Sequence, residues 1–208
     1  MKMKIDGKFG DLSAKVQGVY QRNAERFDRE RPKSLIERHW LQRFYELLPP
    51  NGDVLDVGCG AGEPIAHFFI SNGCRVTGID FSDPMLKIAR SRFPDHNWLY
   101  ADMRRLALAR SFDGIIAWHS FFHLTPADQI QTLPRLARHL RPGAPLLLTV
   151  GPRCGEVVGK VGDEAVYHAS LSPEHYKAIL KSADTSVIEF APEDERCGGA
   201  TVLLARRL

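Results

Sequence analysis

Residues 56–62 read Asp-Val-Gly-Cys-Gly-Ala-Gly and join a short apolar run at residues 54–57 to a helical pattern at residues 65–70. Glycines at such a junction let the backbone adopt positive φ angles and approach a ligand closely. The N-terminus of the following helix directs free N–H groups to the same place. The segment therefore predicts a strand, a ligand-binding loop and a helix in succession.

The same alternation continues along the chain. Two helices are expected from the helical patterns at residues 16–27 and 36–48, and a turn follows at residues 49–52. After this turn, apolar runs typical of strands alternate with helical patterns. Parallel strands that are joined by helices form a sheet covered on both faces. We therefore expect an α/β fold with a doubly wound, mostly parallel sheet. Further strands are expected at residues 75–80, 97–100, 112–118, 145–150, 187–190 and 201–205, and helices at residues 82–92, 125–140 and 172–182.

Two segments depart from this pattern. Pro134 stands inside the helix expected at residues 125–140, and we expect it to kink or split that helix, because proline removes a helical hydrogen bond. Residues 151–170 are rich in glycine and weakly patterned. The length of 208 residues favours one domain. Within it we expect a helical cap at residues 1–50, a cofactor-binding core at 51–150, and a substrate lid with a C-terminal helix and hairpin at 151–208.

The charge pattern argues against nucleic acid as a partner. The formal net charge is only +3, and residues 1–50 interleave 11 Lys and Arg with 7 Asp and Glu, as on a solvated helix face. The four cysteines form no CxxC pair, so neither a zinc site nor a disulfide framework is indicated. No apolar run is long enough for a membrane span, and the first residues lack the apolar core of a secretory signal. We expect a cytoplasmic protein without a membrane partner, and the sequence does not indicate its oligomeric state.

The glycine loop does not fit a dinucleotide. That fingerprint requires a third glycine at position 63, where this chain has Glu63. A pyrophosphate would also meet the carboxylates of Asp56 and Glu63, with no Arg or Lys in the loop to offset them. A ligand with an ammonium group would instead be stabilised by Asp56, and its carboxylate could bind the helix N–H groups. The loop therefore favours a ligand with an amino acid moiety.

Two further acidic residues indicate a nucleoside in the same ligand. Asp80 ends the second strand, twenty residues after Gly60, where a carboxylate can accept hydrogen bonds from both ribose hydroxyls. Asp102 follows the third strand and could accept a hydrogen bond from the amino group of adenine, or could instead cap the next turn. Phe81 and Met103 could enclose the adenine ring. A nucleoside at one end and an amino acid at the other describe S-adenosylmethionine.

The motifs VLDVGCGAG at residues 54–62, GIDFS at 78–82, ADM at 101–103, FDGII at 112–116 and LRPG at 140–143 follow one another along the chain. In this order, residues 15–205 resemble the class I S-adenosylmethionine-dependent methyltransferases, in particular small bacterial ones that act on small molecules. The resemblance implies a seven-stranded sheet with an antiparallel last strand. It also assigns a set of residues to the cofactor: Asp56, Gly58 and Gly60 to the methionine end, Asp80 to the ribose, Asp102 with Met103 to the adenine, and Tyr20 and Arg31 to an N-terminal helix that covers it.

The residues after the fourth strand are candidates for catalysis. His119 and His123 lie at the carboxyl edge of the expected sheet, where ligands bind, and one of them could serve as a general base. They could instead line the pocket or lie in the core. Their spacing would suit a metal site, but the segment lacks a glutamate and a third ligand. His168 is a second acid/base candidate. The side chains expected to form an apolar acceptor pocket are Trp118, Phe121, Phe122 and Tyr167, and we also expect Trp118 to contact the cofactor.

The sequence thus predicts an enzyme that transfers a methyl group from S-adenosylmethionine to an oxygen, nitrogen or carbon atom of a small molecule. Residues 117–120 contain neither the Asn-Pro-Pro-Tyr motif typical of nucleic-acid amino methylases nor the Pro-Cys motif of cytosine methylases. Methyl transfer depends mainly on positioning, so a missing catalytic dyad is no argument against catalysis. A non-catalytic S-adenosylmethionine-binding module stays open as an alternative. A nicotinamide-dependent oxidoreductase is disfavoured by Asp56 and Glu63.

Overall fold

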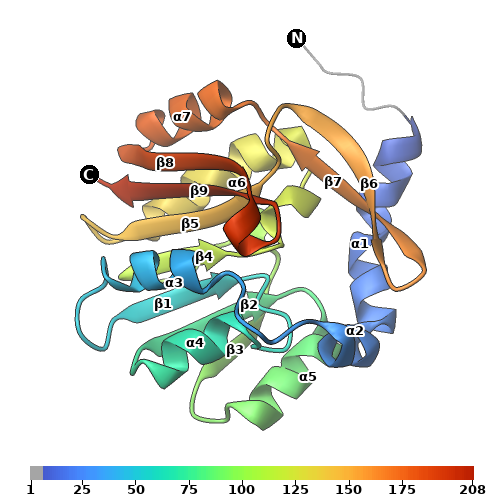
Figure 1. The fold of residues 1–208 in the computed structure, drawn as a ribbon, viewed down its shortest axis with the longest axis horizontal. Coiled ribbons are helices and arrows are strands. Elements are labelled where there is room, and N and C mark those ends of the chain that lie inside the picture. Colours follow the sequence, from blue (N-terminus) through green and yellow to red (C-terminus); the bar gives the residue numbers. More distant parts are fainter. Residues whose placement is uncertain (1–6) are drawn as a thin grey trace.

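A seven-stranded sheet organises the computed structural model, which describes residues 7–208. The strands follow the order β3-β2-β1-β4-β5-β9-β8 across the sheet (Figure 1). The first five along the chain are parallel, whereas β9 runs antiparallel to both of its neighbours. The predicted doubly wound sheet with an antiparallel last strand is therefore confirmed. The strands are β1 Asp53–Val57, β2 Arg75–Asp80, β3 Asn97–Tyr100, β4 Gly114–Ala117, β5 Pro145–Val150, β8 Thr185–Asp194 and β9 Ala200–Arg207.

Helices cover both faces of the sheet, and each face has its own hydrophobic core (Figure 1). On one face, Trp40 and Phe69 are completely buried against the apolar side chains of β1 and β2. On the other face, Leu136 and Tyr176 are completely buried against β4 and β5. The helices are α3 Arg38–Tyr45, α4 Ile65–Ser71 and α5 Asp83–Arg92 on the first face, and α6 Pro126–Arg138 and α7 Pro173–Ser182 on the second.

Two segments that are far apart in the sequence form a layer beside the sheet, at the right of Figure 1. This cap layer consists of α1 Gly7–Arg22, α2 Ala24–Glu30 and a hairpin of β6 Gly155–Val161 and β7 Glu164–Ser170. Val16 of α1 is buried against Tyr167 of β7. The Arg22 guanidinium also pairs with the Glu164 carboxylate at 2.5 Å. Both apolar packing and charge therefore join α1 to the hairpin.

The hairpin differs from the weakly patterned stretch expected at residues 151–170. Its two strands are joined by Gly162 and Asp163, and Gly162 has a φ of +57°. Two-residue hairpin loops require such positive φ angles. Gly159 in β6 lies against the His168 ring, which a Cβ atom at this position would approach to 2.4 Å. These glycines serve the turn and the packing, and they also obscure the alternating pattern of a strand.

One helix expectation is wrong, and one of the two outcomes expected at Pro134 is not observed. The pattern over residues 16–27 is not one helix, because it is divided at Asn23, whose amide side chain donates to the Val19 carbonyl and to Glu164. Pro134 does not split α6, which runs without a break from Pro126 to Arg138. Ile130, whose carbonyl loses its usual donor four residues on, is exposed, so water can replace that donor. Within residues 7–208, no helix is long and apolar enough to cross a membrane.

Candidate functional site

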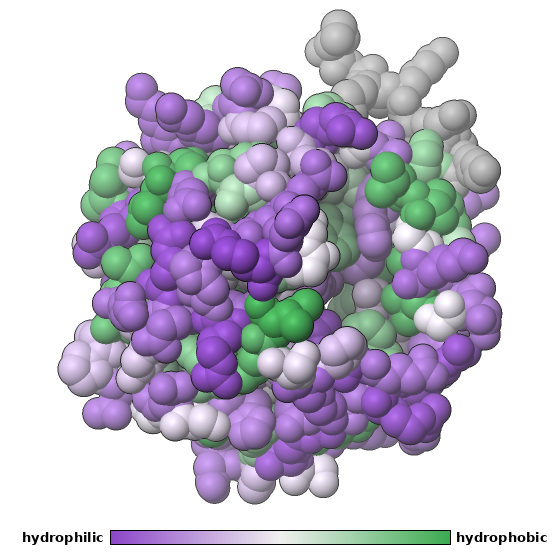
Figure 2. Space-filling model, in the orientation of Figure 1, coloured by the Kyte–Doolittle hydropathy of each residue, from purple (hydrophilic) through white to green (hydrophobic). Residues whose placement is uncertain are grey.

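A pocket of about 260 Å³ lies between the carboxyl ends of β1, β2 and β4 and the cap layer. The surface is hollowed between the body of the sheet and α1 (Figure 2). Most of the site residues expected from the sequence line this pocket. They are Tyr20, Arg31, Asp56, Gly58, Gly60, Asp80, Phe81, Asp102, Met103, Trp118, His119 and His123.

The loop after β1 is held in place by its own backbone. The N–H groups of Gly58 and Cys59 donate to the Ile79 carbonyl at 2.7 and 3.0 Å, and the Gly60 N–H donates to Asp80 Oδ2 at 2.9 Å. Gly58 has a φ of +73°, and a Cβ there would lie 2.3 Å from the Ser120 side chain, so no larger residue fits. Because these three loop amides already have partners, they are not free to bind a ligand carboxylate, a role that the sequence assigned to the N–H groups of the following helix.

Asp56 and Arg31 bring two buried charges of opposite sign to the pocket. Asp56 Oδ2 and Arg31 Nε are both buried without a hydrogen-bond partner within residues 7–208. Burial raises the pKa of Asp56 to about 7, while the charge of Arg31 opposes the rise and that of Asp80 adds to it. Burial likewise lowers the pKa of Arg31. Arg31 Nη2 lies 3.9 Å from the Glu37 carboxylate, which leaves its Nε free. Buried polar atoms without partners are costly, and an ammonium group near Asp56 Oδ2 and a carboxylate near Arg31 Nε, both on one ligand, would satisfy the two atoms. These residues therefore fit the amino acid end of S-adenosylmethionine.

Glu63 is better compensated than the sequence of the loop suggests. Its carboxylate pairs with Lys33 at 2.7 Å and with Arg92 at 3.3 Å, and both cations come from outside the loop. Glu63 would therefore repel a phosphate less strongly than expected. Asp56, which has no ion pair within 4.0 Å among the described residues, keeps the preference for a cationic group.

Asp80 is buried at the end of β2 and fixes the loop. Its two carboxylate oxygens accept hydrogen bonds from the N–H groups of Gly60 and Ser82 at 2.9 and 2.8 Å. Burial raises the pKa of Asp80 to about 6, and these amides oppose the rise. A carboxylate has about four acceptor positions, so Asp80 keeps capacity for ribose hydroxyls. Its place in the pocket suits the expected role.

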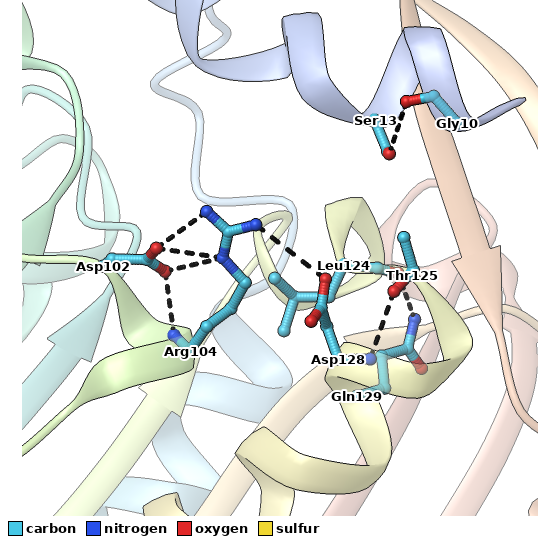
Figure 3. A network of polar contacts seen from close by, with 8 residues as sticks. All are labelled: Gly10, Ser13, Asp102, Arg104, Leu124, Thr125, Asp128 and Gln129. Atoms are coloured by element: carbon cyan, nitrogen blue, oxygen red, sulfur yellow. Dashed lines mark hydrogen bonds and ion pairs between the residues drawn. The ribbon is translucent and has the colours of Figure 1, made fainter.

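Asp102 takes part in a charged network at one side of the pocket (Figure 3). Both of its oxygens accept from the Arg104 guanidinium, the shortest contact being 2.7 Å, and Oδ1 also accepts the Arg104 N–H at 2.9 Å. Asp102 thus caps the short helix Met103–Arg105, as the alternative interpretation held, while it also lines the pocket. Arg104 Nη1 also lies 3.9 Å from Asp128 Oδ2. Ser13 of α1 lines the opposite side of the pocket (Figure 3). Arg104 was not expected from the sequence, although its position two residues after Asp102 could have indicated it.

His123 joins the pocket to the cap layer. Its Nδ1 donates to the Tyr167 carbonyl, because a carbonyl oxygen can only accept, and its Nε2 then accepts from the Tyr20 hydroxyl; both distances are 2.9 Å. Burial lowers the pKa of His123 to about 3, so the ring is neutral at pH 7. With both ring nitrogens engaged, His123 is arranged to hold Tyr20 rather than to accept a proton from a substrate.

The other two histidines differ in position. Burial and the charge of Arg31 lower the pKa of His119 to about 4, and neither of its ring nitrogens has a hydrogen-bond partner within the described residues. His168 does not line the pocket, because it projects from β7 against the Phe122 ring, with the ring centroids 4.6 Å apart. Burial lowers its pKa as well.

The expected aromatic acceptor pocket does not form as one group. Trp118 lines the pocket, but Phe121 is fully buried in the core of the sheet. Tyr167 is fully buried beneath α1, and its hydroxyl donates to Glu156. A residue not expected from the sequence is Gln17 of α1, whose amide donates to the Phe81 carbonyl at 2.8 Å. No local pattern marks it, because the contact spans 64 residues of chain.

Known proteins resemble this chain in sequence. Residues 54–143 match the family described as "Methyltransferase domain". An O-methyltransferase from Pyrenophora dematioidea is 36% identical over 179 residues, which cover 78% of this chain and 66% of that protein. The dTDP-3-amino-3,6-dideoxy-alpha-D-glucopyranose N,N-dimethyltransferase of Streptomyces fradiae is 31% identical over 137 residues, covering 64% of this chain and 50% of that protein. The chain thus spans about two thirds or less of the length of the curated relatives it matches.

Solved structures resemble it in fold. The crystal structure of magnesium protoporphyrin IX methyltransferase from Synechocystis, with bound S-adenosylmethionine, has a TM-score of 0.70 to this chain, covers all of both chains and is 16% identical. The sheet order, the motifs of the predicted cofactor loop and these matches agree with one another. The chain belongs to the class I S-adenosylmethionine-dependent methyltransferases.

Proposed function

We propose that this protein transfers a methyl group from S-adenosylmethionine to an oxygen, nitrogen or carbon nucleophile of a small molecule. The observation that carries the proposal is that Asp56 and Arg31, whose charges are opposite, each bring to the pocket a buried atom without a hydrogen-bond partner within residues 7–208, Asp56 Oδ2 and Arg31 Nε. Their signs match the ammonium and carboxylate of the cofactor's amino acid end. Asp80, and Asp102 with Phe81 and Met103, line the remainder of the pocket and suit the ribose and the adenine.

The residues of the chain contribute mainly by positioning. S-adenosylmethionine supplies a methyl group on a positively charged sulfur, which makes it ready for in-line displacement. Holding the two reactants in line contributes roughly 7–11 kcal/mol to such a reaction. Tyr20 and Gln17 of α1 bind His123 and the Phe81 carbonyl, so the cap layer is tied over the pocket. This closure keeps water from the reacting atoms.

The relatives support a small molecule as the acceptor. One is an O-methyltransferase and another an N,N-dimethyltransferase of a nucleotide sugar, so both oxygen and nitrogen acceptors occur among them. We also propose that the protein is cytoplasmic.

Within the domain, we propose that residues 1–50 act as a cap and residues 151–170 as part of a lid, both over a core at residues 51–150.

Calorimetry tests the proposal directly. S-adenosylmethionine and its demethylated product, S-adenosylhomocysteine, should both bind, whereas NAD should give no heat. Heat from NAD alone would refute the cofactor assignment. A screen that detects S-adenosylhomocysteine release then separates an enzyme from a non-catalytic binding module, because only the enzyme forms this product in the presence of an acceptor.

A further inference from the structure

A second cleft opens on the far side of His119. It has a volume of about 500 Å³ and lies between the segment after β5, the β6–β7 hairpin and the turn between β8 and β9. This volume falls within the range of about 300–1,000 Å³ that small-molecule sites occupy. We call this second cleft the acceptor cleft, and the pocket that contains Asp56, Asp80 and Asp102 the cofactor pocket. Among the residues that the structure describes, His119 lines both.

His119 is held at the junction by its backbone. Its φ is +54°, in the left-handed region, and its N–H donates to Thr149 Oγ1 at 2.6 Å. The ring packs between Trp118 and Phe122, with centroids 5.5 and 5.9 Å away. A residue in this strained conformation persists only where the surrounding structure fixes it, and such residues cluster at functional sites. The result is a neutral imidazole, without a protein partner among residues 7–208, between two cavities.

The chemistry of the acceptor cleft favours an uncharged aromatic ligand. Its inner wall is formed by the rings of Phe122, His119 and His168, which offer flat surfaces for stacking. Its charged side chains are the carboxylates of Glu156 and Glu193 against the single guanidinium of Arg153. This excess of negative charge disfavours an anionic acceptor.

We propose that the acceptor cleft binds the methyl acceptor, and that this acceptor is an uncharged aromatic alcohol whose hydroxyl donates a hydrogen bond to His119. The inference rests on the proposed function and names its substrate class. In the transfer, a lone pair of the hydroxyl oxygen forms the new carbon–oxygen bond, and the electron pair of the broken carbon–sulfur bond stays on sulfur as a neutral thioether. The hydroxyl proton passes to the free ring nitrogen of His119.

The basicity of His119 distinguishes a hydroxyl from an amine. An alkyl ammonium group must lose a proton before it can attack, and an imidazole whose pKa is about 4 is too weak a base to remove that proton. A hydroxyl oxygen becomes strongly acidic as the carbon–oxygen bond forms, so the proton then moves to the imidazole downhill in free energy. His119 therefore suits an acceptor that is neutral before the reaction, as a hydroxyl group is, and not an alkyl ammonium group.

Cys154 gives a test of binding that needs no turnover. It is exposed and lines the acceptor cleft, whereas Cys59, Cys74 and Cys197 are buried. With 2-naphthol at about ten times its dissociation constant, alkylation of Cys154 by N-ethylmaleimide should slow about tenfold. The anion 2-naphthoate, which has the same ring system, should give no protection at the same concentration. Equal protection by both compounds, or by neither, would overturn the proposal.

Two adjacent valines of β6 provide a matched pair for the turnover test. Val157 lines the acceptor cleft, whereas Val158 is also exposed but does not line it, because successive side chains of a strand point to opposite faces. Val157→Trp should raise the KM for 2-naphthol roughly tenfold or more without changing the affinity for S-adenosylmethionine. Val158→Trp should change the KM by less than about twofold. Equal effects of the two variants would overturn the placement of the acceptor.

His119→Asn tests the proton transfer, since asparagine tolerates the left-handed backbone conformation. This variant should lower kcat by about 100- to 10,000-fold and leave the KM near the wild-type value. An unchanged kcat would overturn the role of His119. If S-adenosylmethionine binds but neither 2-naphthol nor catechol is methylated, the aromatic alcohol is refuted and the proposed function stands. If S-adenosylmethionine does not bind, the proposed function itself fails.

Discussion

Replacing Asp56 by asparagine should stabilise the free protein while it weakens cofactor binding. Burial raises the pKa of Asp56 from 3.8 to about 7. A rise of about three units corresponds to about 4 kcal/mol at roughly 1.4 kcal/mol per unit, and this is the upper limit of the destabilisation by the ionised carboxylate. The destabilisation is absent below pH 3.8, grows as the pH rises to 7 and is constant above. Asp56→Asn removes it, so the gain in the free energy of unfolding should be largest at pH 8.

Urea unfolding of the free protein at pH 8 and at pH 4.5 measures this effect. The difference in unfolding free energy between Asp56→Asn and the wild type should shrink at the lower pH. Calorimetry with S-adenosylmethionine should give an affinity that is lower by about 1.5–3 kcal/mol, the contribution of a hydrogen bond to a charged group. The two effects of one substitution therefore have opposite signs.

Asp102→Asn is the matched control in the same pocket. Burial acts to raise the pKa of Asp102, but its hydrogen bonds and charge interaction with Arg104 outweigh it, and the net shift is downward. Removing this charge should leave the free protein no more stable than before. The reasoning would be refuted if Asp56→Asn destabilised the free protein at pH 8, or if it bound S-adenosylmethionine as tightly as the wild type.

Three other outcomes are expected. The affinity for S-adenosylmethionine should fall as the pH drops below about 7, because Asp56 becomes protonated, and calorimetry in buffers of different ionisation enthalpy should detect proton release on binding. Asp80→Ala should weaken cofactor binding by roughly 1–3 kcal/mol, and an unchanged affinity would place the ribose elsewhere. Because burial lowers the pKa of His123 to about 3, below its unfolded value near 6.5, this residue contributes stability that is present above pH 6.5 and lost as the pH falls. His123→Gln should therefore flatten the decline of the melting temperature between pH 6.5 and pH 4, and an identical decline in both proteins would contradict this.

The sheet was predictable because its signal is local. Each strand from residue 54 to residue 150 is a short apolar run beside a turn or a helical pattern, and the order of these elements is sufficient to predict the parallel arrangement. The acids at the strand ends follow from the same alternation, so Asp56, Asp80 and Asp102 could be placed around one pocket from sequence. Their roles toward the cofactor remain predictions.

A cap at residues 1–50 and a lid at residues 151–208 were expected, but the contacts that join them into the cap layer were not predictable, because they link distant parts of the chain. Arg22 and Glu164 are 142 residues apart, and Tyr20 and His123 are 103 residues apart. Each of these side chains is an ordinary surface or core residue within its own helix or strand. The same holds for His119, whose backbone has a left-handed conformation and whose N–H donates to Thr149 Oγ1, 30 residues away in the sequence.

In the loop after β1, the backbone amides hold the fold, and the side chains are left to bind a ligand. Its amides, from Gly58 to Gly60, are engaged with β2 and maintain the shape of the loop. Recognition of a charged ligand therefore falls to side chains, chiefly Asp56 and Arg31, whose Oδ2 and Nε atoms have no hydrogen-bond partner within the described chain. Because the buried carboxylate of Asp56 has no ion pair among the described residues and destabilises the free protein, folding stability alone would favour a neutral residue at this position. The presence of Asp56 beside Arg31 in one pocket is thus explained by a ligand that carries the two opposite charges.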